Sequence, residues 1–261
     1  MPMKQFPFKR FGVARVLSKQ GLASRTQAAA WVHEGRVSVN GRVVRDPEFP
    51  VVQDRDTIAV ADMTLKAAEV VYLMLNKPRG LVTTTSDEKG RDTVYRCLDN
   101  TGLPWLAPVG RLDKASEGLL LFTNDTAWAA QITSPESTLN KIYHVQINRL
   151  PNAADLKKMQ QGLAIEGELH AMKHVSVLRE GEKNAWLEII LDEGKNRQIR
   201  KILAELNFEV LRLIRVQIGD LQLGGLAKGQ WRMLEKSEAN AFSLRSEHLI
   251  NISPSCITLF Q

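Results

Sequence analysis

The sequence GRLDKASEGLLLFTND, from Gly110 to Asp125, places a charged loop directly before a short apolar run. The run Leu119–Phe122 has the character of a buried strand, and Asn124-Asp125 ends it with turn-forming residues. A rigid strand is a good support for a loop that carries a functional side chain, and Asp113 is the candidate in this loop. An isolated Arg-Leu-Asp sequence is more often a surface turn, so these residues alone do not assign a function.

Two later stretches have a similar character. Lys141-Ile-Tyr-His-Val places Tyr143 on an alternating strand, where a tyrosine is more often part of the core than a catalyst. Glu193-Gly-Lys-Asn-Arg-Gln-Ile-Arg-Lys is a basic loop that leads into a helix expected at 197–206. Four cations beside one acid are unusual at a helix N-terminus, which favours negative charge, although a solvated helix start is the simpler explanation. The residue types alone do not decide whether either stretch has a functional or a structural role.

The spacing of apolar residues predicts the fold class. Helices are expected at 155–162 and 197–206, and strands at 70–75, 119–122, 142–147, 186–191, 210–218 and 231–234. Helices and strands are interspersed without regular βαβ alternation, which favours an α+β fold with a mixed, largely antiparallel sheet. Nearer the N-terminus, Ser24 and Gln27 form a capping box at the start of a helix, and Asn40-Gly41 is a strong hairpin signal. A further strand is expected at 56–60.

The positive charge is concentrated at the N-terminus. Residues 1–45 contain nine Lys and Arg against one acid, Glu34, which gives +8, so the other 216 residues carry −2 of the total +6. A basic segment before a near-neutral body indicates a module that binds a polyanion, although a solvated cationic surface has the same composition.

Several function classes are excluded by missing signals. Neither a dinucleotide-binding nor a phosphate-cradling glycine motif occurs, and His170 and His174 lack the glutamate motif of zinc proteases. Cys97 and Cys256 form neither a disulfide framework nor a metal-ligand spacing. We find no membrane-spanning run and no secretory signal, so we expect a cytoplasmic protein without cofactor or metal.

Together these stretches resemble the RsuA/RluB/RluE/RluF-type pseudouridine synthases. Residues 110–125 are similar to the family signature G-R-L-D-x-x-[ST]-x-G-L-L-x-x-T-N-D, residues 141–145 to K-x-Y-x-V, and residues 193–200 to E-G-x-x-R-Q-[IV]-R. Residues 76–80 and 213–220 are also similar to family segments, and the five matches occur in family order. The chain departs from the pattern where Thr126 replaces the usual glycine and Ser116 the more frequent threonine.

The resemblance implies an α+β pseudouridine-synthase fold and a set of site residues. The catalytic aspartate of the family maps to Asp113, its arginine partner to Arg200, and its tyrosine to Tyr143. Arginine stays charged and binds a carboxylate through two parallel hydrogen bonds, while the tyrosine ring can stack on a base that has left its helix. Arg111 is a candidate for filling the space that the base vacates or for binding phosphate. We also expect Lys141, Lys195 and Arg197 to contact RNA.

The N-terminal segment resembles the alpha-L RNA-binding motif, found in a small-subunit ribosomal protein and appended to this family. We therefore expect a small α/β RNA-binding domain at 1–62, a linker at 63–69, a catalytic domain at 70–240 and a tail of unknown role at 241–261. The RNA contacts expected in the first domain come from basic residues: Arg15, Lys19, Arg25, Arg36 and Arg42.

The resemblance implies a monomeric bacterial enzyme that isomerises a uridine of ribosomal RNA to pseudouridine. The segment at 211–220 is more similar to the RluB and RluE branches, which favours 23S rRNA or a ribosomal precursor as the partner. Two alternatives stay open: the same reaction on small-subunit (16S) rRNA, and a non-catalytic RNA-binding assembly factor that retains the scaffold. Loss of Asp113, Tyr143 or Arg200 would have favoured the assembly factor, and all three are present.

Overall fold

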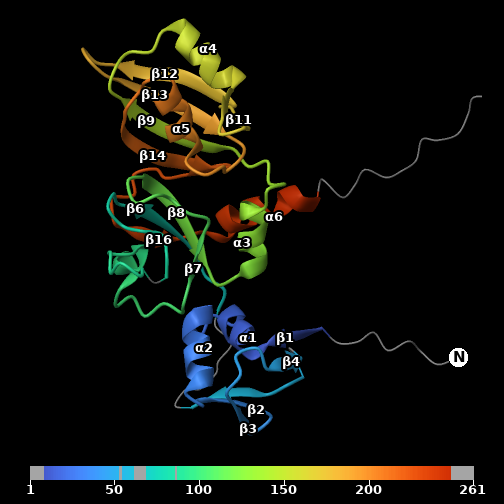
Figure 1. Cartoon of the computed structure of the whole chain (residues 1–261). Coiled ribbons are helices and arrows are strands. Elements are labelled where there is room, and N and C mark those ends of the chain that lie inside the picture. Colours follow the sequence, from blue (N-terminus) through green and yellow to red (C-terminus); the bar gives the residue numbers. More distant parts are fainter. Residues whose placement is uncertain (1–8, 53–54, 62–68, 86, 248–261) are drawn as a thin grey trace, which may run out of the picture. The chain divides into compact units, whose positions relative to one another are not determined.

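The computed structural model describes residues 9–52, 55–61, 69–85 and 87–247 of the chain (Figure 1). It divides into two compact units: residues 1–71 with the short segments 100–107 and 123–126, and the rest of the chain. Residues 63–68 of the expected linker, residues 248–261 of the expected tail, and Cys256 lie outside the described residues.

The N-terminal unit packs two helices with short strands around a small apolar core. Its elements are β1 (Arg10–Gly12), α1 (Val13–Lys19), α2 (Arg25–His33), β2 (Val37–Val39), β3 (Arg42–Val44), β4 (Pro50–Val52) and β5 (Ile58–Val60). Strands β3, β2 and β5 form one sheet in that order, and β1 pairs with β4.

The predicted N-cap of one helix and the predicted hairpin turn of this unit are confirmed. The hydroxyl of Ser24 accepts a hydrogen bond from the backbone N–H of Gln27 at 3.0 Å and so caps α2. Asn40 and Gly41 both have positive φ, 50° and 78°, as a two-residue hairpin turn between β2 and β3 requires.

The larger unit is built on a nine-stranded sheet. Its strands are β6 (Tyr72–Lys77), β7 (Ala107–Val109), β8 (Glu117–Thr123), β9 (Lys141–Ile147), β12 (His174–Glu180), β13 (Ala185–Leu191), β14 (Val210–Ile218), β15 (Leu221–Gln222) and β16 (Trp231–Met233). The order is β12-β13-β9-β14-β8-β6-β16, with β15 beside β14 and β7 beside β8. The other elements are η1 (Val94–Leu98), α3 (Thr126–Thr133), α4 (Ala153–Gln161), the hairpin β10 (Leu163–Ile165) and β11 (Glu168–His170), α5 (Gln198–Glu205) and α6 (Lys236–Glu247).

The sheet has the expected mixed, largely antiparallel character. Strand β14 pairs antiparallel with β9 and parallel with β8, and β13 pairs antiparallel with both β9 and β12. The α+β class expected from the sequence is therefore confirmed.

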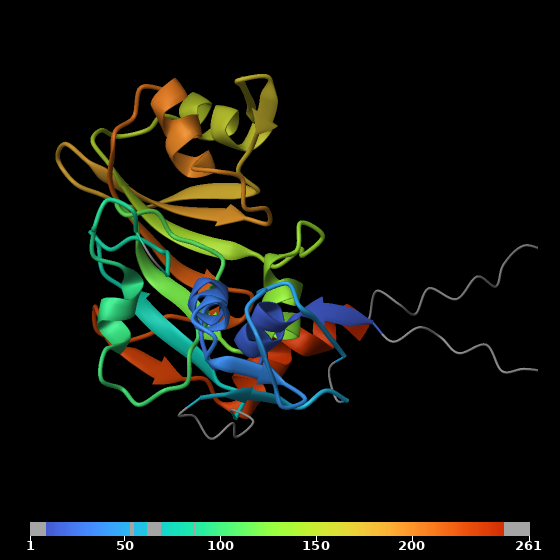
Figure 2. The ribbon, with the colours of Figure 1, turned by 60° about the horizontal axis from the view of Figure 1, so that its bottom comes forward.

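Two separate apolar cores divide this unit into halves. In what we call the Tyr143 half, α4 and α5 pack on β9, β12, β13 and the start of β14, and both helices lie on the same side of these strands (Figures 1 and 2). In the Asp113 half, α3 and α6 pack with β6, β7 and β8 around Trp128. Burial of each large apolar side chain stabilises such a core by roughly 1.5–3 kcal/mol. The two halves meet where β14 lies beside β8.

The end of the larger unit differs from the sequence-based boundary. We expected a tail from residue 241, but α6 continues to Glu247, and Phe242 is buried against Trp128 with ring centroids 5.4 Å apart. The apolar spacing of this weakly amphipathic helix gave no signal. No helix within the described ranges is long and apolar enough to cross a membrane.

Candidate functional site

A cavity of about 520 Å³ opens in the larger unit where its two halves meet. This volume lies in the usual range for small-ligand pockets. Asp113 lines the cavity from the loop before β8, Tyr143 from β9, and Arg200 from α5. The cavity also gathers the four cations that we expected to contact RNA in this domain: Arg111, Lys141, Lys195 and Arg197. Seven residues chosen from three separate stretches of sequence thus line one pocket.

The loop that carries Asp113 is held by backbone contacts. The N–H of Ser116 donates to the carbonyl of Asp113 at 2.9 Å, which closes a turn just before β8. The buried hydroxyl of Thr83 donates to the carbonyl of Leu112 at 2.7 Å. Because β8 is buried along its whole length, the turn stands on a rigid strand, as the sequence predicted.

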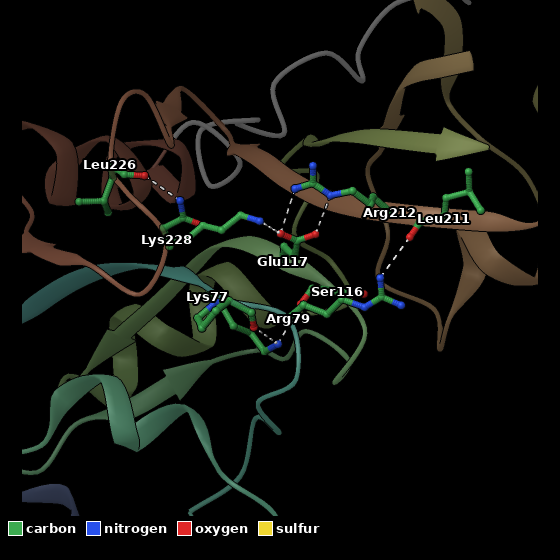
Figure 3. Close-up of polar contacts among 10 residues, drawn as sticks. Lys77, Arg79, Ser116, Glu117, Leu211, Arg212, Leu226 and Lys228 are labelled. Carbon is green, nitrogen blue, oxygen red and sulfur yellow. Dashed lines mark hydrogen bonds and ion pairs between the residues drawn. The ribbon is translucent and has the colours of Figure 1, made fainter. Parts of the chain in front are cut away.

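Lys77, at the end of β6, is a supporting residue that sequence reasoning did not identify. Its side chain is fully buried, and its ammonium group donates to the carbonyls of Pro78, Asp113 and Ser116 at 3.1, 3.2 and 2.8 Å. Figure 3 labels Lys77 and Ser116 of this group. Burial lowers the pKa of Lys77 to about 8, while the negative charge of Asp113 partly opposes this shift. A lysine directly after an apolar strand was the signal that could have revealed it.

The opposite wall of the cavity comes from β9. Tyr143 is buried and pairs with Ile189 on one side and Arg215 on the other, so its position is fixed by the register of three strands. Lys141 is half-buried on the same strand, and burial, together with the nearby charge of Arg215, lowers the pKa of Lys141. A cation that is partly desolvated in this way gains from contact with an anion.

The arginine beside Asp113 differs from our expectation. We expected Arg200 to pair with the carboxylate, but Arg197 Nη1 lies 3.2 Å from Asp113 Oδ2, and Arg200 instead donates to the carbonyl of Ala115 at 3.2 Å. Arg197 precedes α5 in a left-handed conformation, with φ 52° and ψ 29°, at the exposed mouth of the cavity. Arg200 lies within the first turn of α5 and is half-buried, which directs it to the backbone of the turn.

The loop before α5 is braced from within. The side-chain amide of Gln198 donates to Glu193 Oε1 at 2.5 Å and to the carbonyl of Ala171 at 2.8 Å, and Lys195 lies 3.3 Å from the other oxygen of Glu193. These contacts stabilise the left-handed Arg197, a conformation that costs a non-glycine residue on the order of 1 kcal/mol.

The cavity is electropositive and has unsatisfied donors. Six cations and three acids line it, and the six are Arg111, Lys141, Lys195, Arg197, Arg200 and Arg215. Arg200 Nε and one terminal nitrogen of Arg215 are buried and lack a hydrogen-bond partner in the described part of the chain. The excess of cations over acids suits an anionic ligand, which the positive side chains of the cavity attract.

In the N-terminal unit the expected RNA-binding residues fall into two groups. Arg15 and Lys19 lie over the ring of Phe11, with their charged groups 5.3 and 5.1 Å from its centroid. Arg42 is exposed on β3. In contrast, Arg25 forms an ion pair of 2.9 Å with Glu48, and Arg36 lies 3.7 Å from Glu34, so their charges are already partly balanced.

Known proteins are similar to this chain in sequence and architecture. The family profile described as RNA pseudouridylate synthase matches residues 71–205, and the S4 domain profile matches residues 12–56. An RNA pseudouridine synthase of Rickettsia bellii, described as uncharacterized, is 37% identical over 224 residues, which cover 86% of this chain and 96% of the relative. The ribosomal large subunit pseudouridine synthase B of Bacillus subtilis is 32% identical over 237 residues, or 90% and 96% of the two chains.

A solved structure has the same fold. The crystal structure of a pseudouridylate synthase superimposes with a TM-score of 0.61 at 29% identity, covering 89% of this chain and 99% of the other. The resemblance inferred from five short motifs therefore extends over most of the chain, and the expected fold is confirmed.

Proposed function

This chain belongs to the RNA pseudouridylate synthase family and carries an N-terminal S4 domain, and on that premise we propose that its substrate is a uridine of ribosomal RNA. We propose 23S rRNA, free or within a ribosomal precursor, as the RNA. Two observations support this choice: the similarity to a large-subunit enzyme of Bacillus subtilis, and the resemblance of residues 211–220 to the RluB and RluE branches.

The observation that carries the proposed mechanism is the convergence of Asp113, Tyr143 and Arg200 on one electropositive cavity. The isomerisation breaks the N1–C1′ bond of uridine, turns the uracil, and joins C5 to C1′. One proton leaves C5 and one is gained at N1, so the reaction consumes no oxidant, reductant or external atom. Acidic and basic side chains can therefore perform it without a cofactor.

Each of the three residues has a role that fits its position. The carboxylate of Asp113 acts at the sugar, as a nucleophile or as a stabiliser of developing positive charge. Arg197 places a positive charge 3.2 Å from the carboxylate of Asp113. Arg200 places a second one in the loop, where it donates to the carbonyl of Ala115 at 3.2 Å. The ring of Tyr143 stacks against the turned base, and its hydroxyl relays a proton during turnover, accepting one from carbon while it gives up its own.

A uridine within an RNA helix reaches such a cavity only by leaving the stack. The cations at the cavity mouth bind the phosphates on either side of the extruded nucleotide, and we assign this role to Lys195 and Arg197, both exposed. Lys141, deeper in the wall, faces the nucleotide itself. Exposed Arg111 fills the space that the base vacates or binds a phosphate.

The experiment that tests this proposal is pseudouridine mapping on both ribosomal RNAs. We expect cells that lack the gene to lose one carbodiimide-dependent primer-extension stop in 23S rRNA. Wild-type protein should restore the stop and Asp113→Asn should not. A stop lost from 16S rRNA would correct the substrate, and unchanged profiles of both RNAs would contradict enzymatic action on ribosomal RNA.

We further propose that the N-terminal unit docks the RNA through its unpaired basic surface, in a monomeric cytoplasmic protein. Exposed Arg15 and Arg42 are the residues best placed for phosphate contacts, with Lys19 beside Arg15 over Phe11. Each lost phosphate contact lowers the slope of log affinity against log salt by roughly 0.7–0.9. We expect Arg15→Gln and Arg42→Gln to reduce this slope on an rRNA fragment. Arg25→Gln, which removes a cation already paired with Glu48, is the matched control, and equal slopes in all three variants would contradict the docking role.

A further inference from the structure

The junction between the two halves of the larger unit is narrow. Strand β14 pairs with β9 over seven residue pairs, but its parallel register with β8 comprises two, Ile214 with Glu117 and Arg215 with Gly118. Asp113 precedes β8 by four residues, whereas Tyr143 and Arg200 belong to the other half. The alignment of the cavity walls therefore depends on this short contact together with the contacts of Arg197 and Arg200 with the Asp113 turn.

A buried carboxylate spans the junction. The side chain of Glu117 is 3% exposed, and its two oxygens accept hydrogen bonds from Arg212 Nε and Nη2 on β14, each at 3.0 Å (Figure 3). Lys228, in the loop before β16, lies 2.5 Å from the same carboxylate. The two cations more than offset the cost of burial and lower the pKa of Glu117, so the carboxylate stays ionised.

The backbones touch at the same place. Gly118 has φ of 102°, and a Cβ at this position would lie 2.2 Å from the carbonyl oxygen of Arg215. The buried guanidinium of Arg215 also donates through Nε to the carbonyl of Leu119 at 2.8 Å. At this close approach no side chain separates the two strands, so the polar contacts of Glu117 and Arg215 bear directly on their register, beside the apolar packing of Ile218 in the Asp113 half.

We propose that Glu117 is a positioning residue for the isomerisation: its ion pair with Arg212 fixes the register of β8 against β14 and so aligns Asp113 with Tyr143 and Arg200. This proposal rests on the proposed function. A buried ion pair adds little net stability compared with an apolar pair of the same shape, and its best supported role is to specify one arrangement among several. A displacement of about 1 Å between reacting groups can cost on the order of 100-fold in rate.

The primary variant is Glu117→Gln, which keeps the shape and removes the charge. We expect kcat, measured by tritium release from 5-tritiated uridine in an rRNA transcript, to fall on the order of 100-fold, while KM changes by less than about threefold. The KM should hold because the cations that contact RNA are unchanged. A residue that only supported folding would lower the amount of active protein and leave kcat per folded molecule intact.

The matched control is Glu238→Gln. Glu238, on α6, accepts two hydrogen bonds from the terminal nitrogens of Arg232 at 2.6 and 2.7 Å, a bidentate ion pair that is 26% exposed on the carboxylate side and lies within the Asp113 half alone. We expect this variant to unfold at lower urea concentration than wild type but to keep kcat within about twofold. An equal loss of kcat in Glu238→Gln would overturn the proposal, because the effect would then follow from any lost ion pair.

A second variant covers the case in which Glu117→Gln does not fold. Arg212→Lys keeps a cation opposite Glu117 but loses the two-pronged contact, and we expect kcat to fall by about tenfold. If Glu117→Gln or Arg212→Lys is folded and retains kcat within about threefold of wild type, Glu117 does not position Asp113. A wild-type protein that releases no tritium from any rRNA transcript would instead contradict the proposed function and is recognisable as a separate result.

Discussion

The Asp113 half and the Tyr143 half contribute to the same cavity but hold their functional groups differently. Tyr143 lies on a central strand and Arg200 in the first turn of a helix, so hydrogen-bonded regular structure fixes both. Asp113 lies on a turn, and buried polar groups from other elements hold that turn: the ammonium of Lys77 and the hydroxyl of Thr83. A turn exposes the carboxylate to substrate, but its position then depends on long-range contacts.

This difference predicts which property each half loses when one of its residues is replaced. A change at Tyr143 itself should remove one function and leave the geometry intact, because backbone pairing of β9 with β13 and β14 sets the register of its strand. Changes beneath the Asp113 turn should alter the position of the carboxylate without touching the substrate. We expect the largest loss of activity from a change at Asp113 itself.

The first variant removes the negative charge of Asp113. Asp113→Asn keeps the shape of the side chain but cannot act as a nucleophile or offset positive charge at the sugar, so we expect tritium release to fall on the order of 1,000-fold or more. RNA affinity in a filter-binding titration should change little. Activity within tenfold of wild type would remove Asp113 from the mechanism.

The second variant tests the hydroxyl supplied by β9. Tyr143→Phe retains the buried ring and its strand register, and we expect kcat to fall on the order of 100-fold because a proton acceptor is lost. The melting temperature and RNA affinity should stay close to those of wild type. A fully active phenylalanine variant would limit Tyr143 to stacking.

The third comparison separates the two arginines of the Tyr143 half. Exposed Arg197 makes one contact with Asp113, which a lysine can replace, so Arg197→Lys should lower kcat by less than about threefold. Half-buried Arg200 needs its planar group to reach the turn, so Arg200→Lys should lower kcat by about tenfold or more. The reverse ranking in single-turnover assays would assign the main supporting role to Arg197.

Sequence reasoning predicted the elements that local patterns encode. The capped helix at Ser24, the Asn40-Gly41 turn and the strand that carries Tyr143 follow from residue spacing, and the structure contains each of them. The motifs also identified side chains that converge on one cavity, because each motif lies at the end or in the middle of a regular element.

The contacts that hold the Asp113 turn could not be predicted in this way. Lys77 and Glu117 act through partners 36 and 95 residues away, Asp113 and Arg212, and no local spacing reports such a distance. The ion pair of Arg197 with Asp113 depends on a left-handed backbone conformation that an arginine rarely adopts. The sequence therefore indicates candidate site residues more readily than it indicates which residues hold them in place.

The last prediction concerns stability rather than activity. The buried Lys77 beneath the Asp113 turn should make the free energy of unfolding depend on pH. The pKa of Lys77 is about 8 in the folded protein against an ordinary value of 10.5. Below pH 8 both the folded and the unfolded chain carry the proton. Between pH 8 and 10.5 the unfolded chain binds a proton that the folded chain has released, so the free energy of unfolding contributed by this group rises with pH. We expect wild type to gain up to about 3 kcal/mol over this range relative to Lys77→Met, measured by urea unfolding. Lys173→Met, which changes an exposed lysine paired with Asp192, should show the same pH dependence as wild type. Parallel stability curves for wild type and Lys77→Met would show that the ammonium is not desolvated, and the turn would then owe its position to other contacts.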